Sequence, residues 1–298
     1  MCMSDDKKKG VILKGIGGFY YVLADGKEYE TRARGLFRKD GIKPVPGDRV
    51  VITLPTDVSG GYLEDILERK NQLIRPMVAN MDRLMIVVSA KAPQADLLLV
   101  DKLLIYAAYN KLPAVLVINK CDESLSTANE IASQYKGIVE TVIVSAKTGE
   151  GLDSFKALLR GKTTCFAGQS AVGKSSLLNA VCSRLELETG GLSKKTARGK
   201  HTTRHSELIY IPELDAMVTD TPGFSILELM DLEPEQLKDF YPEFKGADCR
   251  FAGKCLHYKE PECGVIERLK NKEISEHRYK RYLELLEYLK QRKERKYD

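Results

Sequence analysis

A phosphate-binding loop constrains this chain more than any other feature. The stretch GQSAVGKSSLLNA, residues 168–180, fits the pattern G-x-x-x-x-G-K-[ST], with the apolar TCFA before it and the helix-forming SSLLNAV after it. The motif needs this strand–loop–helix context, because backbone N–H groups at the start of a helix bind phosphate oxygens. We expect Lys174 to reach the β- and γ-phosphates and Ser175 to bind Mg²⁺. The alternative, a chance glycine-rich turn, does not account for this context.

A second motif, DTPG at residues 220–223, follows the apolar strand AMVT. Alone, D-x-x-G is a weak pattern, but here it ends a strand about fifty residues after the phosphate loop. Asp220 is therefore predicted to hold Mg²⁺, through water, and the Gly223 N–H to face the γ-phosphate.

Two further motifs select the base. NKCD, residues 119–122, ends the strand AVLVI, and SAK, residues 145–147, stands at the end of the next strand. Ligands of open α/β sheets bind outside the carboxyl ends of the strands, so both positions suit a base. The Asp122 carboxylate can accept two hydrogens from N1 and the 2-amino group of guanine, a pair that adenine lacks. The motifs therefore predict guanine specificity.

The other residues of these motifs have supporting roles. Asn119 is expected to contact the other edge of the base and to tie neighbouring loops together, and the stem of Lys120 to cover the base face. The Ala146 N–H can meet the guanine O6. The residues assigned to GTP are Asn119, Lys120, Asp122, Ser145, Ala146, Lys147, Gly168, Gln169, Ser170, Ala171, Val172, Gly173, Lys174, Ser175, Ser176, Asp220 and Gly223.

The order of the motifs is rotated. A GTPase usually presents the phosphate loop, a switch, D-x-x-G, N-K-x-D and S-A-K in that order, whereas here the last two come first. From Met81, apolar strand patterns alternate with helical ones, which predicts a parallel sheet wrapped by helices. A sheet whose termini lie close together can be cut and rejoined elsewhere without moving its site. We predict an α/β fold, a circularly permuted P-loop GTPase domain.

The residues around this domain predict two others. Residues 10 to about 68 have short strand patterns with Gly and Pro turns, including the hairpin GFYYVL-ADG-KEYETRA, and suit a small β-barrel. Recurring Gly, Tyr, Phe and Arg are common in oligonucleotide-binding (OB) barrels. The alternative is a barrel with Tyr and Phe in its core and Arg and Lys in solvent.

Near the C-terminus, three cysteines and a histidine form the pattern C-x5-C-x-H-x5-C: Cys249, Cys255, His257 and Cys263. Three thiolates and an imidazole are a standard tetrahedral Zn²⁺ set, and a closed set of four is structural. We assign no metal to His205 or His277. Loss of the metal is expected to unfold this short tail. Its final helix, with apolar Tyr282, Leu285, Leu286 and Leu289, suits packing by that stripe, docking on RNA by its basic faces, or both.

The composition limits the class of protein. With 298 residues, of which 43% are hydrophobic and 30% charged, two or three soluble globular domains are expected. The net charge of +5 is small, so contact with nucleic acid would come from local patches. No apolar run is long enough to span a bilayer, and the start MCMSDDKKKG is no secretory signal, so we predict a cytoplasmic protein without a membrane partner. Seven cysteines are then not expected to form a disulfide framework.

The group that positions the attacking water is not the residue that usually does so. Many GTPases place glutamine directly after D-x-x-G, but this chain has Phe224, so slow intrinsic turnover is expected. His201, between the phosphate loop and D-x-x-G, is the candidate, and a solvated or phosphate-contacting loop residue is the alternative. Thr203, or else Thr202, would sense Mg²⁺ and the γ-phosphate. The segment 194–204 has five basic residues and no acidic one, as in a solvated loop or an RNA contact.

The chain resembles the bacterial ribosome small-subunit-dependent GTPase A family along essentially its whole length. The signatures that carry the resemblance are NMDRLMIVVSA, NKCD, SAKTGEGL, GQSAVGKSSLLN, GKHTTRHSEL, DTPGF and CRFAGKCLHYKEPECGV. The resemblance implies three domains: an OB barrel that binds RNA or the ribosome (1–70), the permuted GTPase (71–234) and a zinc-binding helical domain (235–298). It also implies Mg²⁺-dependent GTP hydrolysis, stimulated by the 30S subunit and its 16S rRNA, late in assembly of that subunit.

Two other functions remain open from the sequence. An ATP-using P-loop protein would leave Asn119 and Asp122 without a role. A plain RNA-binding or scaffolding protein would bind nucleotide only for stability, and no partner would stimulate hydrolysis. Nothing in the sequence requires more than a monomer.

Overall fold

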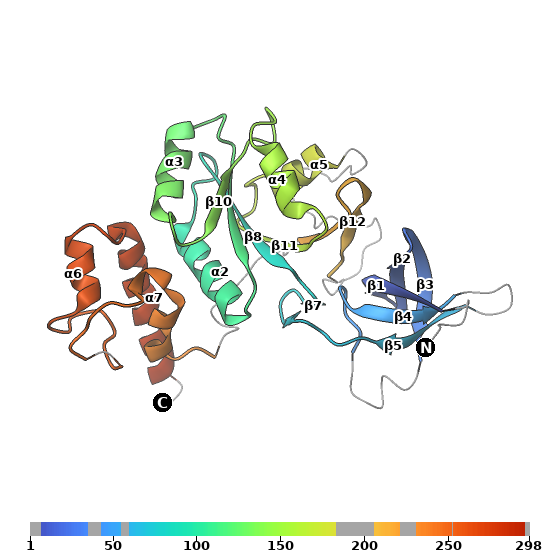
Figure 1. Cartoon of the computed structure of the whole chain (residues 1–298), viewed down its shortest axis with the longest axis horizontal. Coiled ribbons are helices and arrows are strands. Elements are labelled where there is room, and N and C mark those ends of the chain that lie inside the picture. The colour runs from blue at the N-terminus through green and yellow to red at the C-terminus, as the bar shows by residue number, and fades with distance from the viewer. Residues whose placement is uncertain are drawn as a thin grey trace.

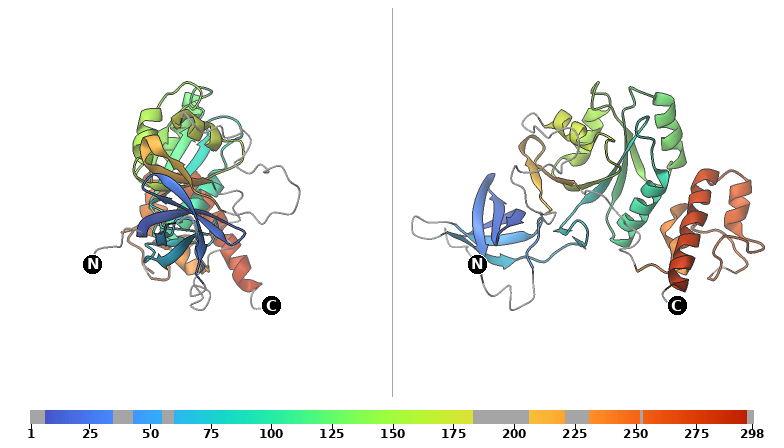
Figure 2. Two further views of the ribbon diagram at one scale, coloured as in Figure 1. Left: turned by 90° about the vertical axis from the view of Figure 1, so that its right-hand side faces the viewer. Right: turned by 180° about the vertical axis from the view of Figure 1, so that it is seen from behind.

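The computed structural model describes residues 7–34, 43–54, 60–182, 206–220, 231–251 and 253–295. An N-terminal barrel and a C-terminal helical region lie at opposite ends of a central sheet (Figures 1 and 2). No helix within those ranges has both the length and the apolar character needed to cross a membrane.

The barrel is closed and has five strands, β1 (Lys7–Ile16), β2 (Phe19–Ala24), β3 (Lys27–Ala33), β4 (Arg49–Thr53) and β5 (Gly61–Ile66), in the order β1-β2-β3-β5-β4. The predicted hairpin is β2–β3, which pairs antiparallel from Phe19–Arg32 to Ala24–Lys27. Only the β3–β5 pair is parallel among the strand pairs described in the barrel. The predicted OB-type barrel is confirmed.

Among the described barrel residues, no aromatic side chain is fully buried in the core, although Tyr20 and Tyr29 pack against it. The fully enclosed side chains are aliphatic: Ile12, Val22, Ala24, Val50, Ile52 and Leu63. The guanidinium of Arg32 lies 4.5 Å from the ring centre of Phe19, and that of Arg34 lies 5.7 Å from the ring centre of Tyr62. A barrel of five short strands has room inside only for compact side chains, so these rings lie outside, beneath arginines.

The central sheet has six strands in the order β10-β9-β8-β11-β13-β12. They are β8 (Arg83–Ser89), β9 (Ala114–Asn119), β10 (Glu140–Ile143), β11 (Thr163–Ala167), β12 (Ile209–Ile211) and β13 (Ala216–Asp220), and the short pair β6 (Gln72–Leu73) and β7 (Val78–Ala79) precedes them. All pairs are parallel except β12–β13. This is the predicted permuted GTPase sheet, with the phosphate-loop strand β11 inside it.

Helices cover both faces of the sheet. They are α2 (Leu97–Tyr109), α3 (Leu125–Gln134), α4 (Leu152–Leu159) and α5 (Lys174–Val181), with a short 3-10 turn η1 (Pro212–Leu214). Along β8, Leu84 and Ile86 point into the core with α2 and α3, whereas Met85 and Val87 point into the core with α4 and α5. A strand buried on both faces explains the unbroken apolar run LMIVVSA.

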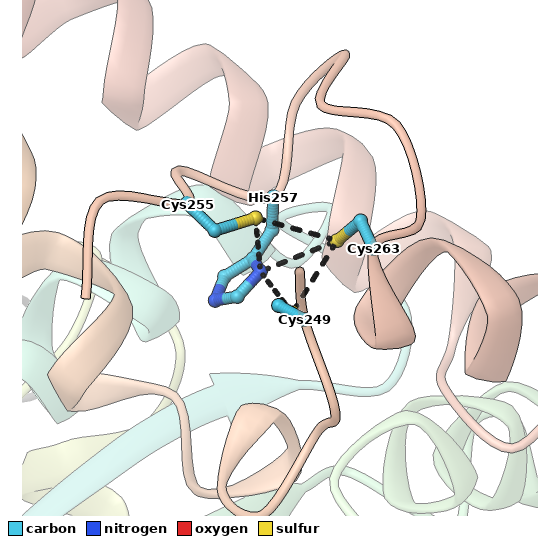
Figure 3. Close-up of side chains that lie close together, drawn as sticks. All are labelled: Cys249, Cys255, His257 and Cys263. Carbon is cyan, nitrogen blue, oxygen red and sulfur yellow. Dashed lines mark hydrogen bonds between the residues drawn. The ribbon is translucent and has the colours of Figure 1, made fainter. Parts of the chain in front are cut away.

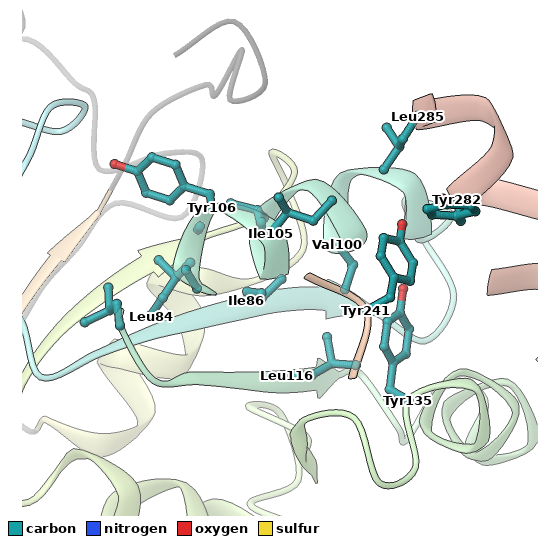
Figure 4. Close-up of a cluster of buried hydrophobic side chains, with 14 of the residues drawn as sticks. Leu84, Ile86, Val100, Ile105, Tyr106, Leu116, Tyr135, Tyr241, Tyr282 and Leu285 are labelled. Carbon is teal, nitrogen blue, oxygen red and sulfur yellow. The ribbon is translucent and has the colours of Figure 1, made fainter. Parts of the chain in front are cut away.

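The C-terminal region contains the 3-10 helices η3 (Pro234–Phe240) and η4 (Pro242–Phe244), then α6 (Gly264–Lys270) and α7 (Glu276–Glu294). The segment with the cysteines is irregular, so the helical prediction holds only on either side of it. Tyr282, Leu285, Leu286 and Leu289 are all buried, which confirms packing by this stripe. They share one core with α2 and the sheet (Figure 4). The tail is therefore held by more than a metal.

Candidate nucleotide and metal sites

The phosphate loop leaves β11 and enters α5 as the motif predicts. Gly168 and Gly173 have φ of 138° and 95°, which favour glycine. A Cβ on Gly168 would lie 2.1 Å from the Val87 carbonyl oxygen, and one on Gly173 would lie 2.3 Å from the Asn119 Nδ2. Both positions exclude any side chain, because the loop is packed directly against β8 and the NKCD segment.

The side chain of Lys174 folds back over this loop. Its Nζ donates to the carbonyl oxygens of Gly168, at 3.0 Å, and Gln169, at 2.8 Å. Ser175 is buried in the first turn of α5, whereas Ser170 and Ala171 are exposed. The ammonium group therefore stands within the loop, where a phosphate can replace the carbonyl oxygens as its partner.

The base-recognition motifs meet at the same edge of the sheet. Ser145 Oγ donates to the Asp122 Oδ1 at 2.6 Å, and Asn119 Nδ2 donates to the Val172 carbonyl at 2.9 Å. Asn119 Oδ1 accepts from the Ala146 N–H at 3.2 Å. Asn119 thus ties the SAK loop to the phosphate loop, as predicted, and Asp122 remains exposed with its carboxylate oriented by Ser145.

Lys120 has a related bridging position. Its backbone has a φ of 63°, and its Nζ donates to the Ala171 carbonyl at 3.0 Å and to the Ala92 carbonyl. Lys147 is exposed at the end of the SAK turn, and its backbone N–H donates to the Ser145 Oγ at 3.2 Å. With the three bonds between loops described above, the Lys120–Ala171 bond makes four that join the NKCD, SAK and phosphate loops.

The loop between β8 and α2 also belongs to this site, although none of the nucleotide motifs includes it. Ser89 is buried, and its Oγ donates to the Ala92 carbonyl at 3.0 Å. The Asp96 N–H donates to the Gln169 Oε1 at 3.0 Å, so the start of α2 touches the phosphate loop. The sequence signal that could have found it is its place after an apolar strand, because ligands of open α/β sheets bind at the carboxyl ends of the strands. The structure adds that this strand lies between the motif-bearing strands β9 and β11.

Asp220 is the last residue of β13, which pairs with β11, so its backbone reaches the same edge as the other motifs. Gly223, Phe224, His201, Thr202 and Thr203 lie outside the described residues. Their assignments stay predictions.

The three cysteines and the histidine of the C-terminal region converge (Figure 3). All four are buried, and their ligand atoms lie within 4.8 Å of one another. Sulfur–sulfur distances are 3.6 Å (Cys255–Cys263) and 3.9 Å (Cys249–Cys263), and the His257 Nδ1 lies 3.3–3.7 Å from the three sulfurs. Tetrahedral zinc, with bonds of about 2.3 Å to sulfur and 2.0–2.1 Å to nitrogen, needs edges of about 3.8 and 3.5 Å. The cluster can hold such an ion.

Burial favours the neutral forms of the side chains in the cluster. Burial, together with the neighbouring Cys263 and Cys249, raises the pKa of Cys255 to about 12, and burial followed by the charge of Lys238 lowers the pKa of His257. A neutral imidazole is the form that binds metal, and a cation would favour the thiolates that burial disfavours. The Tyr279 hydroxyl donates to the His257 carbonyl at 2.6 Å and so fixes the backbone of the ligand.

Comparison with known families gives two matches that together span most of the chain. The family described as RsgA N-terminal domain matches residues 9–63, and the family described as RsgA GTPase matches residues 66–230. The first covers the barrel, and the second covers the sheet with all its nucleotide motifs.

Similar proteins extend the likeness over the full length. A small ribosomal subunit biogenesis GTPase RsgA of Ruminiclostridium cellulolyticum is 44% identical over 282 residues, 93% of this chain and 92% of the relative. Its namesake in Geobacillus thermodenitrificans is 42% identical over 294 residues, 96% and 99% of the two chains. Among solved structures, YjeQ from Thermotoga maritima has a TM-score of 0.81 at 38% identity and covers 95% of this chain and 98% of its own. YloQ, described as a circularly permuted GTPase, has a TM-score of 0.78 at 36% identity, with 98% and 99% covered.

Proposed function

Because the chain belongs to the RsgA GTPase family, we propose that it hydrolyses GTP to GDP and phosphate and acts in biogenesis of the small (30S) ribosomal subunit. In this proposal the protein binds the subunit late in its maturation, the subunit stimulates hydrolysis, and hydrolysis is linked to release. Two relatives are named small ribosomal subunit biogenesis GTPase, which supports a role in assembly of this subunit. The proposed location is the cytoplasm.

One observation carries the proposal. The hydrogen bond of Ser145 to Asp122 joins the two base-recognition motifs, and that of Asn119 to the Val172 carbonyl joins them to the phosphate loop at one sheet edge. An Asp carboxylate held this way can accept the two N–H donors of guanine. The Asn119 side-chain amide, which bridges the loops, fixes the distance between this carboxylate and the phosphate loop. We therefore assign GTP and GDP to the residues named in the sequence analysis.

For the chemical step, we propose that Ser175, Thr203 and Asp220 hold Mg²⁺. Lys174 would stabilise the negative charge on the transferred phosphate. The ion would neutralise the charge that develops on the β- and γ-oxygens. His201 is the residue proposed to position water, with Thr203 as the γ-phosphate sensor.

The two flanking domains are proposed to bind the subunit and its 16S rRNA, with domain limits of 1–70, 71–234 and 235–298, and the protein to act as a monomer. A hollow of about 240 Å³ on the barrel, lined among others by Phe19, Arg32 and Tyr62, supports an RNA-binding role for the first domain. Aromatic faces and arginines are what single-stranded RNA binds through stacking and charge.

The function is tested by phosphate release from purified protein. We expect slow release from GTP alone, a rise of about two orders of magnitude or more with 30S subunits, as partner-supplied stabilisation gives other GTPases, and none from ATP. Release from GTP that 30S subunits leave unchanged would remove the ribosomal partner but keep the nucleotide site. Equal release from ATP would remove the guanine assignment.

We further propose that Cys249, Cys255, His257 and Cys263 hold one structural Zn²⁺ per chain. Replacement of Cys255 by serine is then expected to remove the metal and make residues 245–263 sensitive to protease. The buried stripe of α7 should stay docked on the shared core, because it does not depend on the ion. Metal analysis and limited proteolysis measure both effects.

Cys182→Ser is the matched control, because Cys182 is also buried but lies at the end of α5, outside the cluster. It should retain one zinc ion per chain. Retention of one zinc ion per chain by Cys255→Ser would contradict the assignment.

A further inference from the structure

A bulge in the first barrel strand turns one residue out of the barrel. Along β1, Ile12 pairs with Val22 and Lys14 pairs with Tyr21, so Leu13 is skipped in the register with β2, and the register with β4 ends at Val11. A bulge leaves one residue unpaired and re-aims its side chain. The side chain of Leu13 is buried in the core that contains the central sheet, whereas Ile12 is buried in the barrel core.

The released residue contacts the chain that enters β12. The Leu13 carbonyl accepts from the Leu208 N–H at 2.8 Å, and Leu208 is buried in the same core as Leu13. Next to this bond, Lys14 Nζ pairs with the Glu207 Oε1 at 3.0 Å. We call Leu13, Lys14, Glu207 and Leu208 the clasp. Figure 1 and the reverse view in Figure 2 both place β12 on the side of the sheet that faces the barrel.

Short stretches of chain connect the clasp to two parts of the proposed GTPase site. Strand β12 starts one residue after Leu208 and pairs with β13, whose last residue is Asp220. In the sequence, Thr203 precedes Leu208 by five residues, which can span at most about 17 Å. A displacement of Leu208 would therefore reach β13 through the β12–β13 hydrogen bonds, and only five residues separate Leu208 from Thr203 in the sequence.

Resting on the GTP hydrolysis proposed above, we propose that the clasp couples the barrel to the catalytic segment, so that RNA bound to the barrel changes the rate of hydrolysis through Leu13 and Leu208. These two are positioning residues, since neither belongs to the nucleotide motifs. The chemistry of the contact suits this role: a single backbone hydrogen bond and one half-exposed ion pair can shift with the barrel without unfolding either core.

Coupling between two sites is reciprocal, so the bound nucleotide must also change the conformation or stability of the barrel. Hydrogen exchange of the full chain, with GDP and with a non-hydrolysable GTP analogue, measures this without any ribosomal partner. We expect the exchange of β1 amides around Leu13 and of Leu208 to differ between the two states, and the β1 difference to vanish in Leu13→Ala. Identical β1 exchange in the two states of the wild type would overturn the clasp.

A second experiment measures the rate of GTP hydrolysis in the presence of 30S subunits. Leu13→Ala is expected to lower the stimulated rate about tenfold, a usual size for coupling between sites, and to leave the basal rate and the KM for GTP unchanged. Leu73→Ala is the matched control, since Leu73 is buried in the same core on β6 and is not part of the clasp. It should lose similar stability but keep full stimulation.

A charge swap keeps the test valid if Leu13→Ala folds poorly. Glu207→Lys is expected to lower stimulation about threefold, as for an exposed ion pair, and the double variant Lys14→Glu/Glu207→Lys to restore it. Equal stimulation in the wild type, Leu13→Ala, Glu207→Lys and the double variant, with unchanged β1 exchange, would show that the clasp is only structural. Absence of stimulation in the wild type would instead count against the ribosomal partner, and the exchange measurement would still decide the clasp.

Discussion

Replacement of Asp122 by asparagine is expected to lower the affinity for GDP and GTP about 30- to 1,000-fold without unfolding the protein. The carboxylate accepts two N–H groups of guanine, whereas an amide offers one acceptor and points its own N–H₂ at a donor. Hydrogen bonds to a charged group contribute about 1.5–3 kcal/mol each, so a net loss of about 2–4 kcal/mol follows. Calorimetric titration with GDP measures this loss directly.

The same substitution should create a new preference. Xanthine has an oxygen in place of the 2-amino group, so the amide of Asp122→Asn can donate to it, and xanthosine diphosphate should bind the variant better than GDP. Asp153→Asn is the matched control, because that carboxylate is fully exposed on α4 and pairs only loosely with Lys156, at 3.6 Å. Unchanged affinity for GDP in Asp122→Asn would rule out Asp122 as the guanine-binding residue.

A second large effect is expected at Asp101, which lies in α2 but binds the C-terminal region. Its carboxylate is 1% exposed and accepts from Arg278 Nη1 at 2.5 Å, Arg281 Nε at 2.6 Å and the Tyr135 hydroxyl at 2.9 Å. Burial alone would lower the pKa of Arg278, but Asp101 and Glu243 raise it. Removal of one partner from a buried ion pair costs about 3–5 kcal/mol, so Asp101→Asn should lower the free energy of unfolding by that amount.

This loss should appear first as undocking of α7. Urea unfolding gives the total change, and protease sensitivity of the C-terminal region gives its location. Glu276→Gln on the same helix breaks only the exposed pair with Lys280, at 2.6 Å, and should leave stability unchanged within error. If Asp101→Asn behaved like Glu276→Gln, the ion network would not be what holds the C-terminal region to α2.

Much of this architecture could be predicted because its signals are local. Strands β8, β9 and β11 are apolar runs that end in polar motifs, and their parallel pairing then brings NKCD, SAK and the phosphate loop to one edge. The metal cluster could be predicted equally well, since its four ligands fall within fifteen residues of the sequence.

The remaining features depend on single contacts between distant residues. Asp101 and Arg278 are 177 residues apart, and neither belongs to a motif. The contact of Gln169 with Asp96 depends on a side chain in a loop position that the phosphate motif leaves free. The bulge at Leu13 adds one residue to a strand, which a pattern of alternating polarity does not reveal. The sequence could not show whether the Tyr and Phe rings of the barrel lie in its core or on its surface, because this depends on the interior volume of the closed barrel.

The rotated order of the sheet also changes where external force enters the molecule. In the usual order, the chain would begin with the phosphate-loop strand and end beyond the edge strand β10. Here the barrel joins the sheet at β8 and the C-terminal region leaves after β13, and these two strands are the neighbours of β11 on either side. The two flanking domains are thus attached to the two strands that neighbour the phosphate-loop strand. A force that separates these domains acts first, within the sheet, on the β8–β11 and β11–β13 hydrogen bonds.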